Sequence, residues 1–218
     1  MKKSFKDIGE NTDKVYEHGY DNIYPMFLES LRDQEFNMLE IGVNKGSSIK
    51  LWGEYFPHSK IYGVDIDSEW SNERCTTYKF DQSNPKDLKQ IVKTIPDCKF
   101  IIDDGSHIPY HQIITFHELF NNLLEYGGVY IIEDIECSYW RSEAKIYGYE
   151  IGHFNIVDYF KNKTDQINDK ITLNKNRMNI STITFGYNCI VITKKTKREV
   201  ESISSTYEHS HMLNINNK

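Results

Sequence analysis

The fold is indicated first by the stretch FIIDDGSHIPYHQIITFHELFNNLLEYGGVYIIED, residues 100–134. An apolar run from Phe100 to Asp104 predicts a buried strand, and residues 110–126 repeat apolar side chains at helical spacing. We expect Gly127 and Gly128 to end this helix and residues 129–134 to form the next strand. Strands that are apolar without alternation are typical of a parallel sheet that helices cover on both faces.

The same alternation of strands and helices extends outward in both directions. The pattern predicts further strands at 36–43, 60–65 and 75–81, and helices at 24–31, 47–56, 85–95 and around 154–160. Residues 180–185 and 189–193, separated by Gly186-Tyr187-Asn188, predict a β-hairpin. We therefore expect an α/β, Rossmann-like fold: a mostly parallel seven-stranded sheet with an antiparallel C-terminal hairpin and helices on both faces.

A chain of 218 residues is long enough for one domain with a complete core. We predict a single domain over residues 1–218, with an N-terminal segment at 1–35, a core at 36–195 and a tail at 196–218. The core carries an insertion at 141–179, whose role the sequence does not indicate.

Composition narrows the class of protein. Hydrophobic residues make up 39% of the chain, which is enough for an ordered core and excludes general disorder. The net charge of −6 disfavours nucleic acid as a partner, and no apolar run is long enough for a membrane span. The start of the chain does not resemble a signal peptide, and four widely spaced cysteines predict neither a zinc cluster nor a disulfide framework, so we expect a cytoplasmic location. The oligomeric state, including a homo-oligomer, is left open.

A loop with two glycines follows the first predicted strand. Gly42 and Gly46 precede the helix at 47–56, and glycine lets the backbone approach a ligand closely at such a helix start. Asp65 ends the next strand, where a carboxylate can accept hydrogen bonds from both hydroxyls of a ribose. The loop alone is also typical of an ordinary tight turn, and Asp65 alone of a helix cap. Together they favour a cofactor site.

Two pairs of acids follow neighbouring strands, Asp103 with Asp104 and Glu133 with Asp134. Adjacent parallel strands lie about 4.8 Å apart, so we expect the pairs to converge at one edge of the sheet. Carboxylates so close repel unless they are protonated or neutralised by a cation, and an all-oxygen set favours Mg²⁺. Each acid could instead cap the turn after its strand. His107 follows within the same turn and is a candidate general base.

The glycine loop and the strand-end acids together resemble the S-adenosylmethionine (SAM) site of class I methyltransferases. In that family the first-strand acid and the glycine loop hold the methionine end, the second-strand acid holds the ribose, and the residues after the third strand lie near the adenine. The resemblance implies that SAM is bound by Glu40, Gly42, Gly46, Ser47, Asp65, Asp81, Gln82, Asp103, His18 and Tyr20.

The acid-rich segments also resemble one branch of that family, the macrolide-sugar O-methyltransferases of the macrocin and mycinamicin type. The resemblance covers about residues 8–195 and is carried by Asp103-Asp104-Gly105-Ser106-His107, by Glu133-Asp134, by Ser138-Tyr139-Trp140 and by Thr12-Asp13-Lys14 with His18 and Tyr20. It implies Mg²⁺ held by Asp104, Glu133 and Asp134, and catalysis by His107 as the base together with Asp104. A sugar acceptor would lie against Tyr139 and Trp140, which could equally be core residues.

We therefore expect an O-methyltransferase that depends on SAM and on Mg²⁺ or another divalent cation. Its acceptor would be a sugar hydroxyl of a glycan or of a glycosylated small molecule. The alternatives are a catechol-like or other small-molecule O-methyltransferase, a hydroxylase-like relative with the same sheet and metal layout, and a non-catalytic SAM-binding module.

Overall fold

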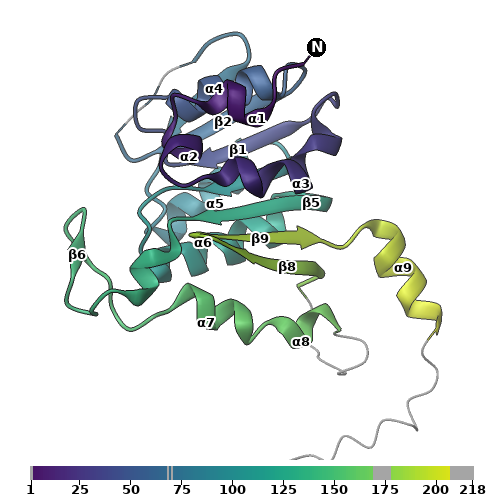
Figure 1. Ribbon diagram of the computed structural model, residues 1–218. Coiled ribbons are helices and arrows are strands. Elements are labelled where there is room, and N and C mark those ends of the chain that lie inside the picture. Colours follow the sequence, from purple (N-terminus) through teal and green to yellow (C-terminus); the bar gives the residue numbers. More distant parts are fainter. Residues whose placement is uncertain (1, 68, 70, 169–177, 207–218) are drawn as a thin grey trace, which may run out of the picture.

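A seven-stranded sheet forms the centre of the computed structural model, which describes residues 2–67, 69, 71–168 and 178–206 (Figure 1). The strand order is β3-β2-β1-β4-β5-β9-β8, and β9 runs antiparallel to both of its neighbours whereas the other adjacent strands pair in parallel. The strands are β1 (Asn37–Ile41), β2 (Lys60–Asp65), β3 (Cys75–Lys79), β4 (Cys98–Asp103), β5 (Leu124–Glu133), β8 (Ile180–Gly186) and β9 (Cys189–Lys194). The predicted fold class is confirmed.

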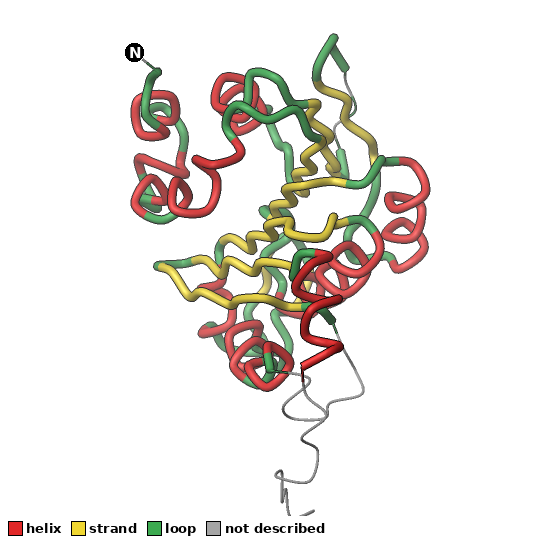
Figure 2. The backbone as a smooth tube through the Cα atoms, turned by 90° about the vertical axis from the view of Figure 1, so that its right-hand side faces the viewer, coloured by secondary structure: helices red, strands yellow, loops and turns green. Residues whose placement is uncertain are grey.

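Helices cover both faces of this sheet, because each central strand buries side chains on both sides (Figure 2). In β4, Phe100 and Ile102 pack into one apolar cluster and Ile101 packs into the other. The first cluster includes side chains of α1 (Phe5–Gly9), α3 (Tyr24–Leu28) and α4 (Ser47–Tyr55). The second includes side chains of α5 (Pro85–Thr94), α6 (Pro109–Asn122) and α7 (Ile156–Lys161).

Shorter elements complete the described part of the chain. The N-terminal segment also contains α2 (Asp13–Tyr16) and the 3-10 turns η1 (Tyr20–Asn22) and η2 (Glu29–Leu31), so the helix predicted at 24–31 continues beyond α3 only as a 3-10 turn. After β5 follow the 3-10 turn η3 (Ile135–Tyr139) and a separate hairpin of β6 (Lys145–Ile146) and β7 (Tyr149–Glu150). The remaining helices are α8 (Thr164–Ile167) and α9 (Lys197–Thr206).

The boundary predicted between the long helix and the fifth strand was wrong. Helix α6 ends at Asn122, not at the glycine pair, and β5 begins at Leu124. The apolar pair Leu123-Leu124 continues the helical pattern in the sequence, but Cys98 N donates to Leu123 O and Leu124 pairs with Cys98, which makes this segment part of the sheet. Gly127, with a φ of +70°, lies within the strand where its register shifts.

The predicted division of the chain into segments stays a prediction. Residues 141–168 of the predicted insertion contain the β6–β7 hairpin, α7 and α8, whereas residues 169–177 lie outside the described part of the chain, as do residues 207–218 of the tail. Among the described residues, no helix is both long and apolar enough to cross a membrane.

Candidate functional site

The predicted site residues lie where the parallel strands end. Gly42 follows β1, Asp65 closes β2, Asp104 follows β4, and Asp134 follows β5. Because these strands are parallel and adjacent, their carboxyl ends meet at one edge of the sheet. The first-strand loop and the fourth strand are in direct contact: a Cβ placed on Gly42 would lie 2.0 Å from the Asp104 carbonyl oxygen. The predicted cofactor loop therefore lies beside the predicted metal edge.

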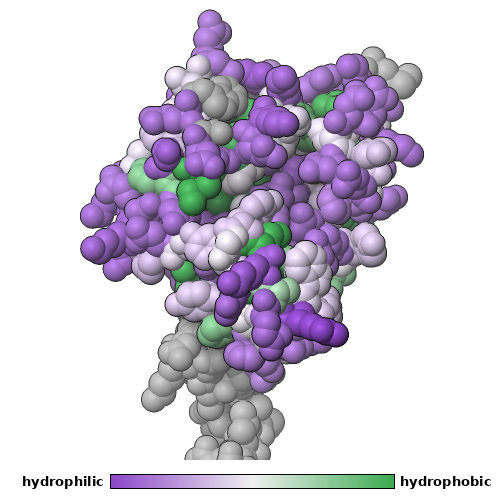
Figure 3. Space-filling view, turned by 90° about the vertical axis from the view of Figure 1, so that its left-hand side faces the viewer, coloured by the Kyte–Doolittle hydropathy of each residue, from purple (hydrophilic) through white to green (hydrophobic). Residues whose placement is uncertain are grey.

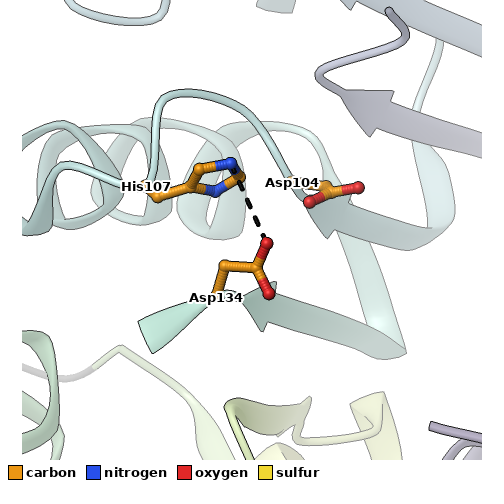
Figure 4. Close-up of side chains that lie close together, drawn as sticks. All are labelled: Asp104, His107 and Asp134. Carbon is orange, nitrogen blue, oxygen red and sulfur yellow. Dashed lines mark ion pairs between the residues drawn. The ribbon is translucent and has the colours of Figure 1, made fainter. Parts of the chain in front are cut away.

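Three side chains form a cluster that could hold a metal ion: Asp104, His107 and Asp134 (Figure 4). One ligand atom from each lies within 4.8 Å of the others, and Nε2 of His107 lies 3.9 Å from Oδ2 of Asp134. Around a six-coordinate Mg²⁺ ion with bond lengths near 2.1 Å, neighbouring ligand atoms lie about 3 Å apart and opposite ones about 4.2 Å apart, so these side chains would move closer together on binding an ion. His107 and Asp134 both have left-handed backbones, with φ values of +58° and +53°, which non-glycine residues adopt rarely.

Asp134 is the best-connected member of this cluster. Its Oδ1 accepts hydrogen bonds from Tyr20 Oη at 3.1 Å and from Asn188 Nδ2 at 2.9 Å, and it lies 3.7 Å from His18 Nε2. The rings of His18 and Tyr20 stack at 5.2 Å. His18 and Tyr20, predicted from the resemblance to bind the cofactor, are thus placed at the fifth-strand acid. Burial, and then the neighbouring Asp104, raise the pKa of Asp134.

A buried lysine that the sequence prediction did not include among the site residues pairs with the acids. Nζ of Lys14 lies 2.6 Å from Glu133 Oε2, 2.7 Å from Asp104 Oδ2 and 3.8 Å from Glu40 Oε1. Burial by itself would lower the pKa of Lys14, but the three carboxylates outweigh it and the pKa is raised well above its usual value. Lys14 is therefore a charged group inside the site, and its ammonium supplies part of the positive charge that the paired acids require.

Glu133, the third metal ligand that the resemblance implies, is not part of the cluster of Asp104, His107 and Asp134. One of its carboxylate oxygens accepts from Lys14 and the other accepts from the hydroxyl of Tyr24, another residue that the sequence prediction did not include. Burial, followed by the proximity of Asp104, raises the pKa of Glu133 well above its usual value even though Lys14 and Tyr24 lower it. The single ammonium of Lys14 therefore does not balance these carboxyl groups, and the remaining repulsion is relieved when one of them takes up a proton or when a cation binds.

Around the glycine loop, Asp65 organises the backbone. Oδ2 of Asp65 accepts from the amides of Val43 and Asn44 at 3.0 and 2.8 Å, and Oδ1 accepts from the amide of Asp67. The loop ends at Gly46, whose φ is +77°, and the exposed Ser47 begins α4. Asp65 is therefore at the loop, as its predicted role as the ribose ligand requires, and that role stays a prediction.

Glu40, in contrast, lies beneath the loop and is fully buried. Its carboxylate accepts from Ser48 Oγ at 2.8 Å and from the indole of Trp52 at 3.2 Å, both on α4. Burial raises the pKa of Glu40 to about 7. These contacts place Glu40 between Lys14 and α4.

Gln82 and Asp103 are joined by a hydrogen bond. Gln82 Nε2 donates to Asp103 Oδ1 at 2.9 Å, and Gln82 Oε1 accepts from the amide of Ser106 at 2.6 Å. This bridge fixes the turn that carries His107. Asp103 is fully buried, and burial raises its pKa to about 6. Asp81 accepts from the amide of Ser83 and lies in the turn before α5.

The two predicted substrate residues are exposed. Tyr139 and Trp140, at the end of η3, are 69% and 46% exposed, which excludes a core role for them. Lys14 and Tyr24, which the prediction did not include, come from the N-terminal segment, and Asn188, also not included, comes from the turn between β8 and β9. The Thr12-Asp13-Lys14 motif was the available signal for Lys14, but its partners Asp104 and Glu133 are 90 and 119 residues away in the chain.

The chain is similar to known proteins in both sequence and structure. No family model matches the chain. A curated relative, the 8-demethyl-8-α-L-rhamnosyl tetracenomycin-C 2'-O-methyltransferase of Streptomyces olivaceus, is 36% identical over 61% of this chain and 37% of its own length. The mycinamicin VI 2''-O-methyltransferase of Micromonospora griseorubida is 35% identical over 56% of this chain and 33% of its own length. The chain thus spans about a third of the length of these relatives.

Among solved structures, the MycE methyltransferase of the mycinamycin biosynthetic pathway, in complex with Mg and SAH, matches with a TM-score of 0.77. The match has 26% sequence identity and covers 90% of this chain and 56% of that one. A second structure of MycE, with Mg, SAH and mycinamycin VI, matches with a TM-score of 0.76 at 25% identity over 89% of this chain and 54% of that one. In sequence and in fold the chain therefore resembles sugar O-methyltransferases of the macrocin and mycinamicin type, as the sequence motifs predict.

Proposed function

We propose that the chain is a SAM- and Mg²⁺-dependent O-methyltransferase that acts on a sugar hydroxyl of a glycan or a glycosylated small molecule. The observation that carries the proposal is the cluster of Asp104, His107 and Asp134 directly beside the glycine loop. Its geometry suits a divalent ion and a base next to a cofactor loop. The similarity to MycE, whose structure contains Mg and SAH, supports the same assignment, because SAH is what remains of SAM after methyl transfer.

Asp104 and Asp134 are the two metal ligands on which the sequence motifs and the observed cluster agree. Glu133 is the third ligand implied by the family resemblance, and its carboxylate bonds to Lys14 and Tyr24 here. A divalent ion bound at this edge would lower the pKa of an acceptor hydroxyl, so that it loses its proton more readily.

His107 would accept that proton. An acceptor oxygen that reaches His107 also lies at the edge next to Gly42, where the methyl donor would be held. The oxygen forms a bond to the methyl carbon while the carbon–sulfur bond of the donor breaks and its electron pair stays on sulfur. His107 thus holds one proton for each methyl group transferred, and orientation by the loop and the acids supplies much of the remaining rate gain.

The assignment is tested by a methyl-transfer screen with SAM and Mg²⁺ against rhamnosyl and other deoxyhexosyl glycosides, nucleotide sugars and catechols. We expect a methylated glycoside, identified by mass and by linkage analysis. His107→Ala should lower kcat by about 10²–10⁴, because general base catalysis contributes that much. The exposed His58, in the loop between α4 and β2, gives the matched control His58→Ala.

The same screen separates the competing assignments. If His107 is the base, the Mg²⁺ concentration for half-maximal rate is unchanged in His107→Ala, whereas a role as metal ligand raises it. His111 is held by Ser106 Oγ at 2.9 Å, and His18 lies beside Asp134, so both are mutated in parallel. A methylated catechol without a methylated glycoside favours the small-molecule alternative. SAM binding without any methylated product favours a binding module.

The predicted cytoplasmic location is part of this proposal. All four cysteines (Cys75, Cys98, Cys137 and Cys189) are buried and unpaired, which suits a reducing compartment. A homo-oligomer is not part of the proposal.

A further inference from the structure

We propose that the β6–β7 hairpin carries the acceptor-binding surface, with the ring of Tyr147 as a platform for the apolar face of a neutral sugar. The proposal rests on the proposed function and adds the site of acceptor binding to it. The hairpin belongs to the insertion at 141–179, for which the sequence indicates no role.

The hairpin lies next to the candidate base. It projects from the end of the sheet that carries the strand-end acids (Figure 1). The ring of Tyr147 at its tip lies 6.2 Å from the ring of His107, centroid to centroid, and the ring of Tyr149 meets that of His111 edge-on at 5.0 Å. Two hairpin tyrosines thus contact the segment that carries His107. Figure 3 faces this end of the molecule, where pale side chains of intermediate hydropathy gather near the centre.

The base of the hairpin is fixed to the site. Ile151, 2% exposed, packs with Ile108 and Cys137 in a small apolar cluster, and its amide donates to Ala144 O at 2.9 Å. Ile108 directly follows His107 in the chain, and Cys137 lies in η3, which begins one residue after Asp134. The hairpin is therefore anchored to both segments that carry the site, and this anchoring sets the position of Tyr147 relative to His107.

The stability of the fold does not explain why position 147 is a tyrosine. The residue is 70% exposed, so burial contributes little to stability, and its backbone is left-handed with a φ of +49°. Gly148 follows with a φ of +84°. Two successive residues with positive φ form a two-residue hairpin turn of the type in which the sequence Asn-Gly is favoured. A bulky side chain in the left-handed region costs about 1 kcal/mol. Neither the turn nor the core accounts for a tyrosine here, whereas contact with a bound molecule does.

The chemistry of the surroundings selects the occupant. A sugar ring has hydroxyls on its edge and apolar C–H groups on its faces, and tyrosine offers a rigid apolar surface with a polar tip. A sugar whose hydroxyl lies within hydrogen-bond reach of His107, about 3 Å, is close enough for its ring to contact Tyr147, because the two aromatic rings are 6.2 Å apart. This edge carries the four carboxyl groups of Glu40, Asp104, Glu133 and Asp134, so Lys14 together with one divalent ion leaves no surplus of positive charge for a diphosphate, and a neutral glycoside fits better than an anionic nucleotide sugar.

The test uses Tyr147→Asn, which places the favoured Asn-Gly pair in the turn and removes the ring. The full chain with Mg²⁺ and SAH is titrated with methyl α-L-rhamnopyranoside and with UDP-glucose, and ligand binding is followed by saturation-transfer NMR. We expect the wild type to bind the rhamnoside in preference to the nucleotide sugar. In Tyr147→Asn we expect the Kd for the rhamnoside to rise about tenfold, the scale of one aromatic stacking contact. SAH affinity should not change, and Tm should not fall.

The control is Tyr126→Asn. Tyr126 is 41% exposed on the same strand that leads to Asp134, but near its opposite end. It should leave the Kd for the rhamnoside unchanged. Equal Kd values in wild type and Tyr147→Asn, or no rhamnoside binding by the wild type, overturn the proposal. So does a loss of self-association in Tyr147→Asn seen by sedimentation, because the patch would then be an interface between two copies.

The outcome is separable from that of the proposed function. Suppose that rhamnoside binding depends on Tyr147 but no acceptor of the screen is methylated. This result contradicts the proposed function and still supports Tyr147 as a sugar-binding platform. Methyl transfer with a KM for the acceptor that Tyr147→Asn does not change contradicts the platform alone.

Discussion

Lys14 is the side chain on which the electrostatics of the site depend most. Its ammonium lies within 2.7 Å of carboxylate oxygens at the ends of two different strands, β4 and β5, and all of these groups are largely removed from water. A buried ion pair adds little net stability compared with an apolar pair, but the loss of one partner leaves a buried charge uncompensated. The N-terminal segment is therefore an electrostatic part of the site as well as a cover for the sheet.

Replacing Lys14 tests this role. Lys14→Met should lower the free energy of unfolding by about 3–5 kcal/mol, the cost of breaking a buried pair on one side. Denaturant unfolding without added metal measures the loss, and adding Mg²⁺ should reduce it because the freed acids gain another cation. Lys161→Met is the matched control, since Lys161 pairs with Asp158 at the exposed surface and should change stability by less than about 1 kcal/mol. A Lys14→Met chain as stable as the wild type would disprove the pairing.

Asp103 makes a pH-dependent contribution to stability. It is fully buried, and burial raises its pKa from 3.8 to about 6. The folded chain therefore binds a proton more tightly than the unfolded chain does. This favours folding below about pH 4, and the advantage is lost as the pH rises toward 6.

Asp103→Asn should remove that dependence. Relative to the wild type, the variant should gain stability between about pH 4 and pH 6, by up to roughly 3 kcal/mol for a two-unit shift. Urea unfolding at both pH values measures the difference. Asp67→Asn, at an exposed turn, is the control. A constant difference in stability between the wild type and Asp103→Asn across this range would show that Asp103 ionises normally.

The loop after β1 is the element that joins the cofactor side of the site to the metal side. Its contact with the end of β4 depends on the absence of a side chain at Gly42, whose φ is +87°. Gly152 has a similar φ of +75°, but a Cβ there would meet no heavy atom of the described residues within 4 Å. An alanine at Gly152 therefore incurs only the energetic cost of its backbone conformation, whereas an alanine at Gly42 also incurs the cost of the steric clash with Asp104.

Alanine substitutions at these two positions should differ. Gly152→Ala should cost about 1 kcal/mol, the backbone penalty alone. Gly42→Ala should cost about 2 kcal/mol more, since the loop must move away from the Asp104 carbonyl, and SAH binding should weaken with it. Unfolding and calorimetric titration measure the two effects. Equal costs in the two variants would mean that the loop can shift without loss.

Sequence patterns predicted the elements whose signals are local. Ile101 and Ile102 sit in a short apolar run that predicts a buried strand, and the acids that follow it predict the functional edge of a parallel sheet. The start of β5 at Leu124 was not predictable in this way, because Leu123-Leu124 fits a helix as well as a strand and only pairing with Cys98 decides between them.

The contacts within the site were harder to predict than its position. The clustering of Asp104, His107 and Asp134 follows from strand adjacency, which topology dictates. Other contacts in the site join segments that are distant in the sequence. They are the ion pair of Lys14 with Glu133, the hydrogen bond of Tyr24 to Glu133 and the hydrogen bond of Gln82 to Asp103. No spacing rule within one segment encodes such contacts, so they emerge only when the chain is folded.

For the molecule as a whole, the central claim is that the strand-end acids and His107 form a metal-dependent methyl-transfer site. The most direct measurement is the rate of methyl transfer from SAM to the acceptor glycoside, taken on the metal-stripped chain and again after Mg²⁺ is restored. We predict that stripping abolishes turnover, that Mg²⁺ restores it, and that Asp134→Asn needs more Mg²⁺ for half-maximal rate because one ligand is weakened. A full rate after exhaustive chelation would contradict the account and leave the acids with structural roles alone.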